Sequence, residues 1–380
     1  MFKSSQLVFN PRVRKSPFFL STMKHGASAF TIYNHMYLPI SYEGVIEDYN
    51  KVLDGVQLWD VGVERQIQIK GPDAEALAQF LTPRDIKKCA VGQAMYAPFL
   101  DFDGGFLNDP VMLKISEDCF WFSIADGDSL LWVQALAAGY KFDVVVDEPD
   151  VSPLQVQGPN SAKLMSKVFG DWIDDLGFYK FKEFNHKGIP MVIARMGYSR
   201  ELCYEIFLQD HSQGNRLWEI LWEAGKDLNL KPFGIRAMNS LRVEKSYKLV
   251  GTELSIEYSP YESGLDKFIH PNKGNFIGLD ALNKWREKGF NNKLITLEVH
   301  NTTDADVLGN NPIYENGSVI GRATGGDFGF RLGKSIALGM VKPELAKVGQ
   351  KLKIDILGKM HEATILEESP YDPENNLLRA

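Results

Sequence analysis

The sequence predicts an α+β protein in which two related α+β subdomains are followed by a C-terminal β-barrel domain. At 380 residues the chain exceeds one average domain, and its 44% hydrophobic and 24% charged residues are ordinary for a globular protein. A strand-to-helix pattern occurs twice, and after Gly289 short β-rich runs alternate with Gly, Pro and Asn turns. We therefore expect a duplicated region over residues 1–289 and the barrel over 290–380.

The duplication is clearest at two strand-to-helix junctions. Residues 66–69 read Gln-Ile-Gln-Ile and lead into a Gly-Pro-Asp turn, whereas residues 154–157 read Leu-Gln-Val-Gln and lead into Gly-Pro-Asn. Asp73 and Asn160 are expected to cap the helices that follow, because Asp and Asn accept hydrogen bonds from a helix's first N–H groups. Apolar spacing then places one face of each helix on a core. These faces are Leu77, Phe80 and Leu81 in the first helix, and Leu164, Met165 and Val168 in the second.

Each half is expected to continue with a strand pair and a second helix. The predicted ranges are 105–115, 119–125 and 129–138 in the first half, and 190–195, 203–208 and 214–228 in the second. The last helix has the clearest apolar face, made by Leu217, Ile220, Leu221 and Ala224. Barrel strands are expected at 294–299, 336–341 and 351–357.

Charge and targeting signals point to a small-molecule partner in the cytoplasm. The formal net charge is −7 without a basic run, which argues against nucleic-acid binding. Residues 1–14 contain no apolar stretch long enough for a signal peptide or a membrane span, so we expect a cytoplasmic protein without membrane contact. A homodimer is left open.

Cysteine and histidine spacing gives no sign of a metal site. Cys89, Cys119 and Cys203 lack a CxxC pair and are expected to be buried, reduced thiols. The seven histidines show neither HxH nor HExxH spacing, so no metal ligands are predicted.

The segment 195–206, Arg-Met-Gly-Tyr-Ser-Arg-Glu-Leu-Cys-Tyr-Glu-Ile, resembles the R-T-G-Y-T-G-E-D-G-x-E motif of the aminomethyltransferase (glycine-cleavage T-protein) family. The resemblance implies tetrahydrofolate as the cofactor and Glu205 as its pterin ligand, since two carboxylate oxygens can accept the N3 and 2-amino protons together. Tyr198 would supply an aromatic wall of the same pocket. A core tyrosine, and an ordinary Glu205–Arg ion pair, are the structural alternatives. Glu201 is expected at the surface.

A second segment, 103–111, reads Asp-Gly-Gly-Phe-Leu-Asn-Asp-Pro-Val and is similar to the family's G-G-I-L-D-D-L-I-V. By this resemblance Asp109 lies near the transferred carbon, where a fixed anion would stabilise positive charge. The alternative is that Asp109 only starts the turn before Pro110. Asn108 stands where the family has an aspartate, which changes the charge of the predicted catalytic pair and disfavours aminomethyl chemistry.

Two further segments extend the resemblance towards residue 278. Residues 238–244 are similar to the family's R-D-S-L-R-L-E helix, and residues 259–278 resemble its T-P-x-E-x-G-L and K-G-D-F-I-G pair. Arg242 is predicted to contact the folate's glutamate tail or to brace Glu205; an ion pair with Glu244 that only supports the helix is equally plausible.

Near the N-terminus, residues 33–39 and 58–66 differ from the T-protein pattern and look like the dimethylsulfoniopropionate demethylase branch. Aromatic side chains can bind a sulfonium or quaternary ammonium cation through cation–π contacts, or wall the pterin. The candidates are Tyr33 and Trp59 for the substrate, and Tyr179 and Tyr198 beside the cofactor. As isolated aromatics, each could also be a core residue.

The resemblance therefore implies a tetrahydrofolate-dependent methyltransferase, or demethylase, that takes methyl from a small sulfonium or methylammonium donor such as dimethylsulfoniopropionate. One alternative is glycine-cleavage aminomethyl transfer, which would need a lipoyl carrier protein as a partner. Another is a non-catalytic folate-binding factor for iron–sulfur assembly, whose relatives carry K-G-C-Y-x-G-Q where this chain has Asn275 in place of the cysteine.

Overall fold

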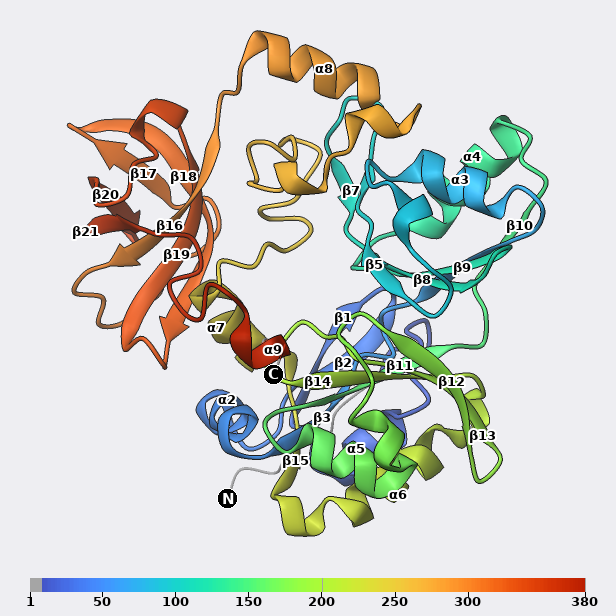
Figure 1. The fold of residues 1–380 in the computed structure, drawn as a ribbon. Coiled ribbons are helices and arrows are strands. Elements are labelled where there is room, and N and C mark those ends of the chain that lie inside the picture. The colour runs from blue at the N-terminus through green and yellow to red at the C-terminus, as the bar shows by residue number, and fades with distance from the viewer. Residues whose placement is uncertain (1–8, 200, 380) are drawn as a thin grey trace. The chain divides into compact units, whose positions relative to one another are not determined.

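The computed structural model describes residues 9–199 and 201–379, which form two compact units. The first unit comprises the chain up to Gln66, Glu148–Met238 and the chain's last residues; the second comprises Ile67–Asp147 and Asn239–Leu377. The element labels used below are those of Figure 1. The expectation for the N-terminal stretch falls mostly on residues 1–8, which lie outside the described residues.

The first unit is organised around a six-stranded sheet in the order β12-β13-β14-β11-β3-β15. All of its neighbours pair antiparallel except β15 and β3, which run parallel. The strands are β3 (Val56–Asp60), β11 (Ser152–Gln157), β12 (Phe181–His186), β13 (Ile189–Ala194), β14 (Cys203–Leu208) and β15 (Leu230–Pro232). The helices are α1 (Phe19–Lys24), α2 (Val45–Asp54), α5 (Ser161–Phe169) and α6 (Gly214–Ala224).

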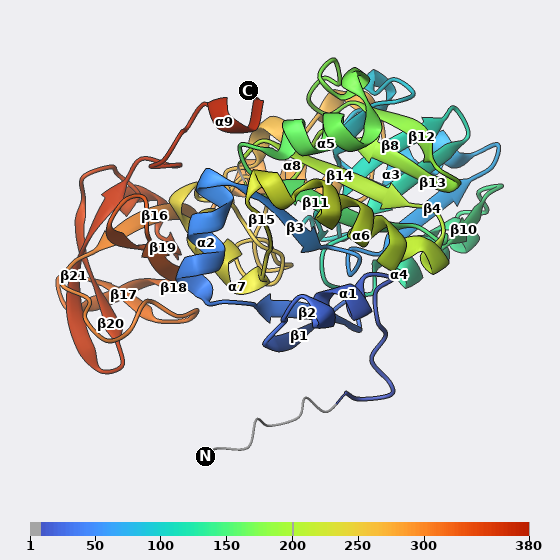
Figure 2. The same ribbon diagram turned by 90° about the horizontal axis from the view of Figure 1, so that it is seen from below.

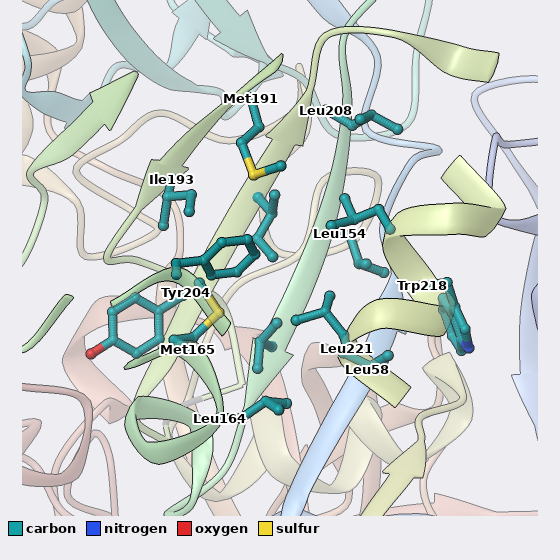
Figure 3. Close-up of a cluster of buried hydrophobic side chains, with 14 of the residues drawn as sticks. Leu58, Leu154, Leu164, Met165, Met191, Ile193, Tyr204, Leu208, Trp218 and Leu221 are labelled. Carbon is teal, nitrogen blue, oxygen red and sulfur yellow. The ribbon is translucent and has the colours of Figure 1, made fainter. Parts of the chain in front are cut away.

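One face of this sheet packs on α5 and α6, as Figure 3 shows. Leu58, Leu154 and Tyr204 come from three neighbouring strands and alternate with residues of the opposite face, as the period of two in a strand requires. Leu164 and Leu221 meet them from α5 and α6. This apolar core leaves the other face of the same strands available for polar side chains.

A separate hairpin precedes this sheet, formed by β1 (Ala29–Tyr33) and β2 (Met36–Ser41), and both strands can be followed in Figure 2. Its two-residue turn uses Asn34 and His35, both with positive φ, which is the conformation that a tight hairpin turn needs. The Asn34 side chain is buried and donates to the Val63 carbonyl at 3.0 Å. The hairpin is thereby attached to the loop after β3.

The second unit begins with a five-stranded sheet in the order β10-β4-β9-β8-β5. Its strands are β4 (Gln66–Lys70), β5 (Ala94–Tyr96), β8 (Val111–Ser116), β9 (Cys119–Ser123) and β10 (Val145–Asp147). Helices α3 (Ala74–Leu81) and α4 (Ser129–Gly139) share its apolar core. The spatial order β4-β9-β8-β5 matches the order β11-β14-β13-β12 of the first unit, and each series starts with a strand that leads into a helix. The predicted relation between two α+β subdomains is confirmed.

The rest of the second unit contains the small β6 (Phe99–Leu100) and β7 (Phe106–Asn108) pair, the end of α7 (Ile235–Glu244), α8 (Leu279–Lys288) and the barrel. The barrel closes in the order β16-β19-β18-β17-β20-β21. Its strands are β16 (Lys293–Val299), β17 (Pro312–Glu315), β18 (Ser318–Gly329), β19 (Lys334–Val341), β20 (Lys351–Ile356) and β21 (Lys359–Leu366). The predicted C-terminal barrel is thus confirmed; helix α9 (Asn376–Arg379) follows it.

Some local expectations were wrong. Neither Asp73 nor Asn160 caps its helix through the side chain: the Asp73 carboxylate accepts from the Asp143 N–H at 2.8 Å, and the Asn160 amide donates to the Leu228 carbonyl. The helix expected over 214–228 ends at Ala224, and the strand expected over 105–115 is divided between β7 and β8. The chain breaks at Asp109-Pro110, where proline lacks the N–H that a continuous strand would use.

The three cysteines are buried free thiols, as predicted. Among the described residues, no helix combines the length and the apolar character needed to cross a membrane.

Candidate active site

A buried polar surface lies on the face of the first unit's sheet opposite the apolar core. In the antiparallel register Gln155 of β11 stands directly between Trp59 of β3 and Glu205 of β14, so these three side chains form one cross-strand row. A second row, two residues along, contains Gln57, Gln157 and Cys203. All six side chains are at most 6% exposed. We call these six residues the polar face.

Glu205 is the most unusual member of the polar face. Its carboxylate is buried and has no hydrogen-bond or ion-pair partner among the residues that the structure describes. Burial raises the pKa of Glu205 well above its ordinary value, and the nearby Glu64 carboxylate raises it further. A buried acceptor pair without protein donors is suited to a ligand that brings two N–H groups. The Glu205–Arg ion pair considered from the sequence is not formed among the described residues.

The amide and indole groups of the polar face are only partly satisfied. Gln155 Nε2 donates to Gln157 Oε1 at 2.6 Å, and Gln57 Nε2 donates to the Asp48 carbonyl at 3.0 Å. Within the described part of the chain, Trp59 Nε1, Gln157 Nε2 and Gln57 Oε1 have no partner. Unpaired buried polar atoms are uncommon in native proteins and mark a place where a polar ligand or water belongs.

Sequence reasoning missed Gln155, Gln157 and Glu64, which no motif singled out. Gln155 and Gln157 occupy alternate positions of a strand, and alternation alone predicted only that one face would be polar. The signal that could have identified them is register, because pairing β11 with β14 brings Gln155 opposite Glu205.

The loop between β13 and β14 lies close to the polar face. A Cβ added to Gly197 would stand 2.4 Å from Cys203 Sγ and 3.2 Å from Gln155 Cδ, so the backbone can approach this closely only as glycine. Tyr198 follows in the same loop and is half-buried. Glu201 was expected at the surface, which is wrong: it is 5% exposed, because the loop returns here to the buried start of β14.

Tyr179 and Trp59 are held by well-defined neighbours. Tyr179 adopts a left-handed backbone with φ 58°, its N–H donates to the Arg195 carbonyl at 2.9 Å, and its ring meets Phe178 edge-on. Arg195 directly follows β13 and starts the loop that carries Tyr198. Trp59 packs edge-to-face on Phe233, with ring centroids 5.3 Å apart. Trp59 and Glu205 are therefore brought together in one row, with Tyr179 connected through the adjoining loop.

Tyr33 belongs to a different group of side chains. It lies at the end of β1 and packs against a small apolar cluster of Met36, Leu38 and Val63. Its expected substrate role stays a prediction.

Asp60 occupies the opposite face of β3 from Trp59. Its carboxylate accepts from the Ser16 hydroxyl at 2.5 Å and from the Gly62 N–H at 3.0 Å. The side chain is 1% exposed, and burial raises the pKa of Asp60 from 3.8 to about 6 despite these bonds. Asp60 is thus a buried acid outside the polar face.

In the second unit, Asn108 and Asp109 stand at the end of β7 and in the break before β8. Asn108 is fully buried, and its amide both donates to the Ala125 carbonyl at 3.0 Å and accepts from the Ala125 N–H at 2.9 Å. The side chain therefore substitutes for a strand partner and fixes the loop after β9. Asp109 is half-buried beside it, at the position where the strand is interrupted.

Arg242 belongs to a buried hydrogen-bond network near the barrel. Its guanidinium pairs with Glu253 at 3.0 Å, and its Nε donates to Asn239 at 2.8 Å. Glu253 also accepts from the Thr324 hydroxyl of β18. Arg242 therefore forms its ion pair with Glu253 and not with Glu244, as one alternative had it. The Glu244 carboxylate accepts from the Arg331 N–H. These guanidinium contacts, with a third to the Tyr247 carbonyl at 3.1 Å, are structural, and the expected contact with a folate tail stays a prediction.

Comparison with known proteins agrees with this architecture. The family model described as the GCVT N-terminal domain matches residues 18–273, and the glycine cleavage T-protein C-terminal barrel domain matches residues 292–372. A solved structure of the glycine cleavage system aminomethyltransferase T from Bartonella henselae aligns with a TM-score of 0.86 at 22% identity, over 95% of this chain and 99% of that one. That likeness establishes the fold.

Two curated relatives cover nearly the whole chain. The dimethylsulfoniopropionate demethylase DmdA of Ruegeria pomeroyi is 35% identical over 94% of this chain and 97% of its own length. An aminomethyltransferase of Desulfitobacterium hafniense is 32% identical over 88% of this chain and 92% of its own length. The repeated α+β subdomains, the barrel and these matches show that the chain belongs to the glycine-cleavage T-protein family of tetrahydrofolate-dependent one-carbon transferases.

Proposed function

We propose that this enzyme transfers a methyl group from a small sulfonium or methylammonium compound, such as dimethylsulfoniopropionate, to tetrahydrofolate. The observation that carries the proposal is Asn108, whose amide nitrogen and oxygen both form a hydrogen bond with the main chain of Ala125. Of the two adjacent predicted catalytic residues, only Asp109 then carries a charge. The 35% identical demethylase supports the same choice.

The polar face fits a reduced pterin. Glu205 offers carboxylate oxygens to which no described residue donates, and Trp59 offers an N–H that has no partner in the described part of the chain and lies in the same row. When bound, tetrahydrofolate supplies the nitrogen nucleophile that accepts the methyl group. Glu205 would hold and orient the pyrimidine edge of the ring, since charge-assisted forked hydrogen bonds fix both position and angle.

Asp109 would act on charge at the reacting centre. A sulfonium or ammonium donor begins cationic and leaves as a neutral thioether or amine that keeps the electron pair of the broken C–S or C–N bond. The new N–CH3 bond would use the lone pair of the folate nitrogen, so the positive charge passes to that nitrogen until its proton is released to solvent. A fixed carboxylate stabilises positive charge far better than water does, because its charge is already in place whereas water dipoles must reorient during the reaction. Aromatic rings such as Trp59 and Tyr198 can bind the cation while leaving its methyl group reactive.

Aminomethyl transfer is the second candidate, favoured by the aminomethyltransferase relatives. It would require a lipoyl carrier protein as a partner. The two candidates differ in the carbon that reaches the folate: methyl in one case, methylene in the other.

A donor panel distinguishes them. The enzyme is incubated with tetrahydrofolate and each of several sulfonium and methylammonium donors, or with the aminomethyl-loaded lipoyl carrier, and the folate product is identified by mass spectrometry. We expect 5-methyltetrahydrofolate from at least one cationic donor and little methylenetetrahydrofolate from the carrier. Efficient methylene transfer with no methyl transfer would reject the proposal. Folate binding without turnover of any donor would favour a non-catalytic folate-binding factor.

A further inference from the structure

The pyrimidine edge of a 4-oxo pterin presents three groups in sequence: the 2-amino donor, the N3–H donor and the 4-oxo acceptor. A carboxylate can satisfy only the two donors. If Glu205 holds the pterin as proposed above, on which this inference depends, the 4-oxo oxygen needs a hydrogen-bond donor beside that carboxylate. A buried carbonyl left without a donor would weaken binding.

The register of the sheet places such a donor next to Glu205. Gln155 is the direct cross-strand neighbour of Glu205, and Trp59 is the next residue in the same row. Adjacent strands lie about 4.8 Å apart, so the row is about 10 Å long. The 2-amino and 4-oxo groups of a pterin are separated by about one strand spacing, which matches the neighbouring positions of Glu205 and Gln155.

The Gln155 amide is held in a defined orientation. One proton of its Nε2 goes to Gln157 Oε1 at 2.6 Å, which identifies the nitrogen end and leaves a second N–H for a ligand. Trp59 Nε1 is a further donor that lacks a partner within the described residues. From Glu205 to Trp59 the row therefore offers acceptors followed by donors, the complement of the 4-oxo edge.

We propose that Gln155, assisted by the Trp59 indole N–H, donates to the 4-oxo oxygen of the pterin and makes this site selective for 4-oxo over 4-amino pterins. A 4-amino group would turn an N–H towards these N–H donors. Such a ligand lacks the 4-oxo acceptor for Gln155 and, because its N3 carries no proton, also the N3–H donor for Glu205. It leaves buried polar groups unpaired at both residues, a defect that gives strong discrimination in polar sites.

The test is the ratio of dissociation constants for tetrahydrofolate and its 4-amino analogue, measured by titration calorimetry on the full chain. We expect the unmodified protein to prefer tetrahydrofolate at least about tenfold, the effect of one hydrogen bond. Gln155→Leu should lower this preference about tenfold, the part that depends on the 4-oxo group, and leave the part that depends on N3–H at Glu205. Gln155→Glu, which as a carboxylate supplies acceptors only, should lower the preference further. Trp59→Phe, which keeps a ring but removes the N–H, should lower the preference partially.

The half-buried Gln213 provides a matched control, since Gln213→Leu makes the same change of side chain outside the polar face, at the end of the short helix His211–Gln213. The ratio is measured with two ligands on one protein sample, so a smaller folded fraction does not alter it. An unchanged ratio in both Gln155 variants would overturn the inference. So would an unchanged folate affinity with a raised KM for the methyl donor, which would assign Gln155 to that donor.

Failure of the inference and failure of the underlying assignment can be told apart with Glu205→Ala. If Glu205→Ala weakens both pterins while the Gln155 variants bind normally, Glu205 is the pterin ligand and only the role of Gln155 is wrong. If Glu205→Ala leaves both affinities unchanged, the pterin does not lie on this row and both assignments are rejected.

Discussion

Replacing Asp60 with asparagine should stabilise the protein at neutral pH, which is unusual for a fully buried, hydrogen-bonded residue. Burial raises the pKa of Asp60 from 3.8 to about 6, so the folded chain holds this proton more tightly than the unfolded chain does. Asp60 therefore contributes fully to the stability of the folded chain below about pH 4, and this contribution is lost as the pH rises through about 6. One pKa unit corresponds to about 1.4 kcal/mol, so ionised Asp60 should cost about 3 kcal/mol at pH 7.

Asp60→Asn removes the charge and keeps the shape. The amide oxygen can still accept from the Gly62 N–H, and the amide nitrogen can donate to the Ser16 hydroxyl. We expect the variant to gain up to about 3 kcal/mol of unfolding free energy at pH 7 and nothing below pH 4. The assay is urea unfolding followed by tryptophan fluorescence from pH 3.5 to 7.5.

Burial also raises the pKa of Asp48 to about 6. Subtracting the unfolding free energy of the parent from that of the variant at each pH removes the contribution of such other acids and leaves that of Asp60. Asp118→Asn is the control of opposite sign, because the Ser116 hydroxyl lowers the pKa of that exposed carboxyl. Its variant should lose stability relative to the parent as the pH rises to about 4, the ordinary pKa of aspartate, and the difference should stay constant above that pH. A difference for Asp60→Asn that does not change with pH, or a variant less stable at pH 7, would refute this reasoning.

Three other predictions concern the active site. Glu205→Ala should weaken tetrahydrofolate binding by about 2–4 kcal/mol. Burial raises the pKa of Glu205, whereas N–H donors of the ligand favour its ionised form. Folate binding should therefore release a proton and become tighter as the pH rises. Calorimetry in buffers of different ionisation enthalpy measures the proton release and the affinity. Asp109→Ala should lower turnover at least about a hundredfold with folate affinity unchanged, which single-turnover kinetics can test. Asn108→Asp should place a carboxylate oxygen against the Ala125 carbonyl oxygen. We expect this to lower the free energy of unfolding in urea by about 1–3 kcal/mol and to reduce kcat. Unchanged values would show that the Asn108–Ala125 hydrogen bond is unimportant.

Much of the fold could be predicted because it depends on patterns that are local in the chain. The two strand-to-helix junctions, the strands over 190–195 and 203–208 and the barrel runs all show their period directly in the sequence. The strand break at Asp109-Pro110 was predicted only as an alternative, the turn before Pro110, while the strand expected over 105–115 ran through it; the missing N–H of proline is the local signal for the break.

The parts that could not be predicted depend on which strands become neighbours. Gln155 acquires its meaning only when β11 pairs with β14, and Arg242 meets Glu253 rather than Glu244 because the chain turns back after α7. Glu201 is adjacent to a charged residue in sequence, which suggested solvent, but its loop returns to the buried start of β14. The charge of a segment does not by itself show whether the folded chain buries that segment.

The place of β3 in its sheet has a consequence for synthesis on the ribosome. Both partners of β3 come later in the chain: β11 begins at Ser152 and β15 ends at Pro232. At roughly 5–20 residues per second, β3 emerges about 10–35 s before β15 is complete. Until β11 has emerged, the apolar Val56 and Leu58 of β3 have no neighbouring strand to pair with, while the intervening residues of the second unit are being made. Nascent chains stopped before residue 150 should therefore be held by chaperones or aggregate, and a slow, late assembly step should accompany the release of longer ones.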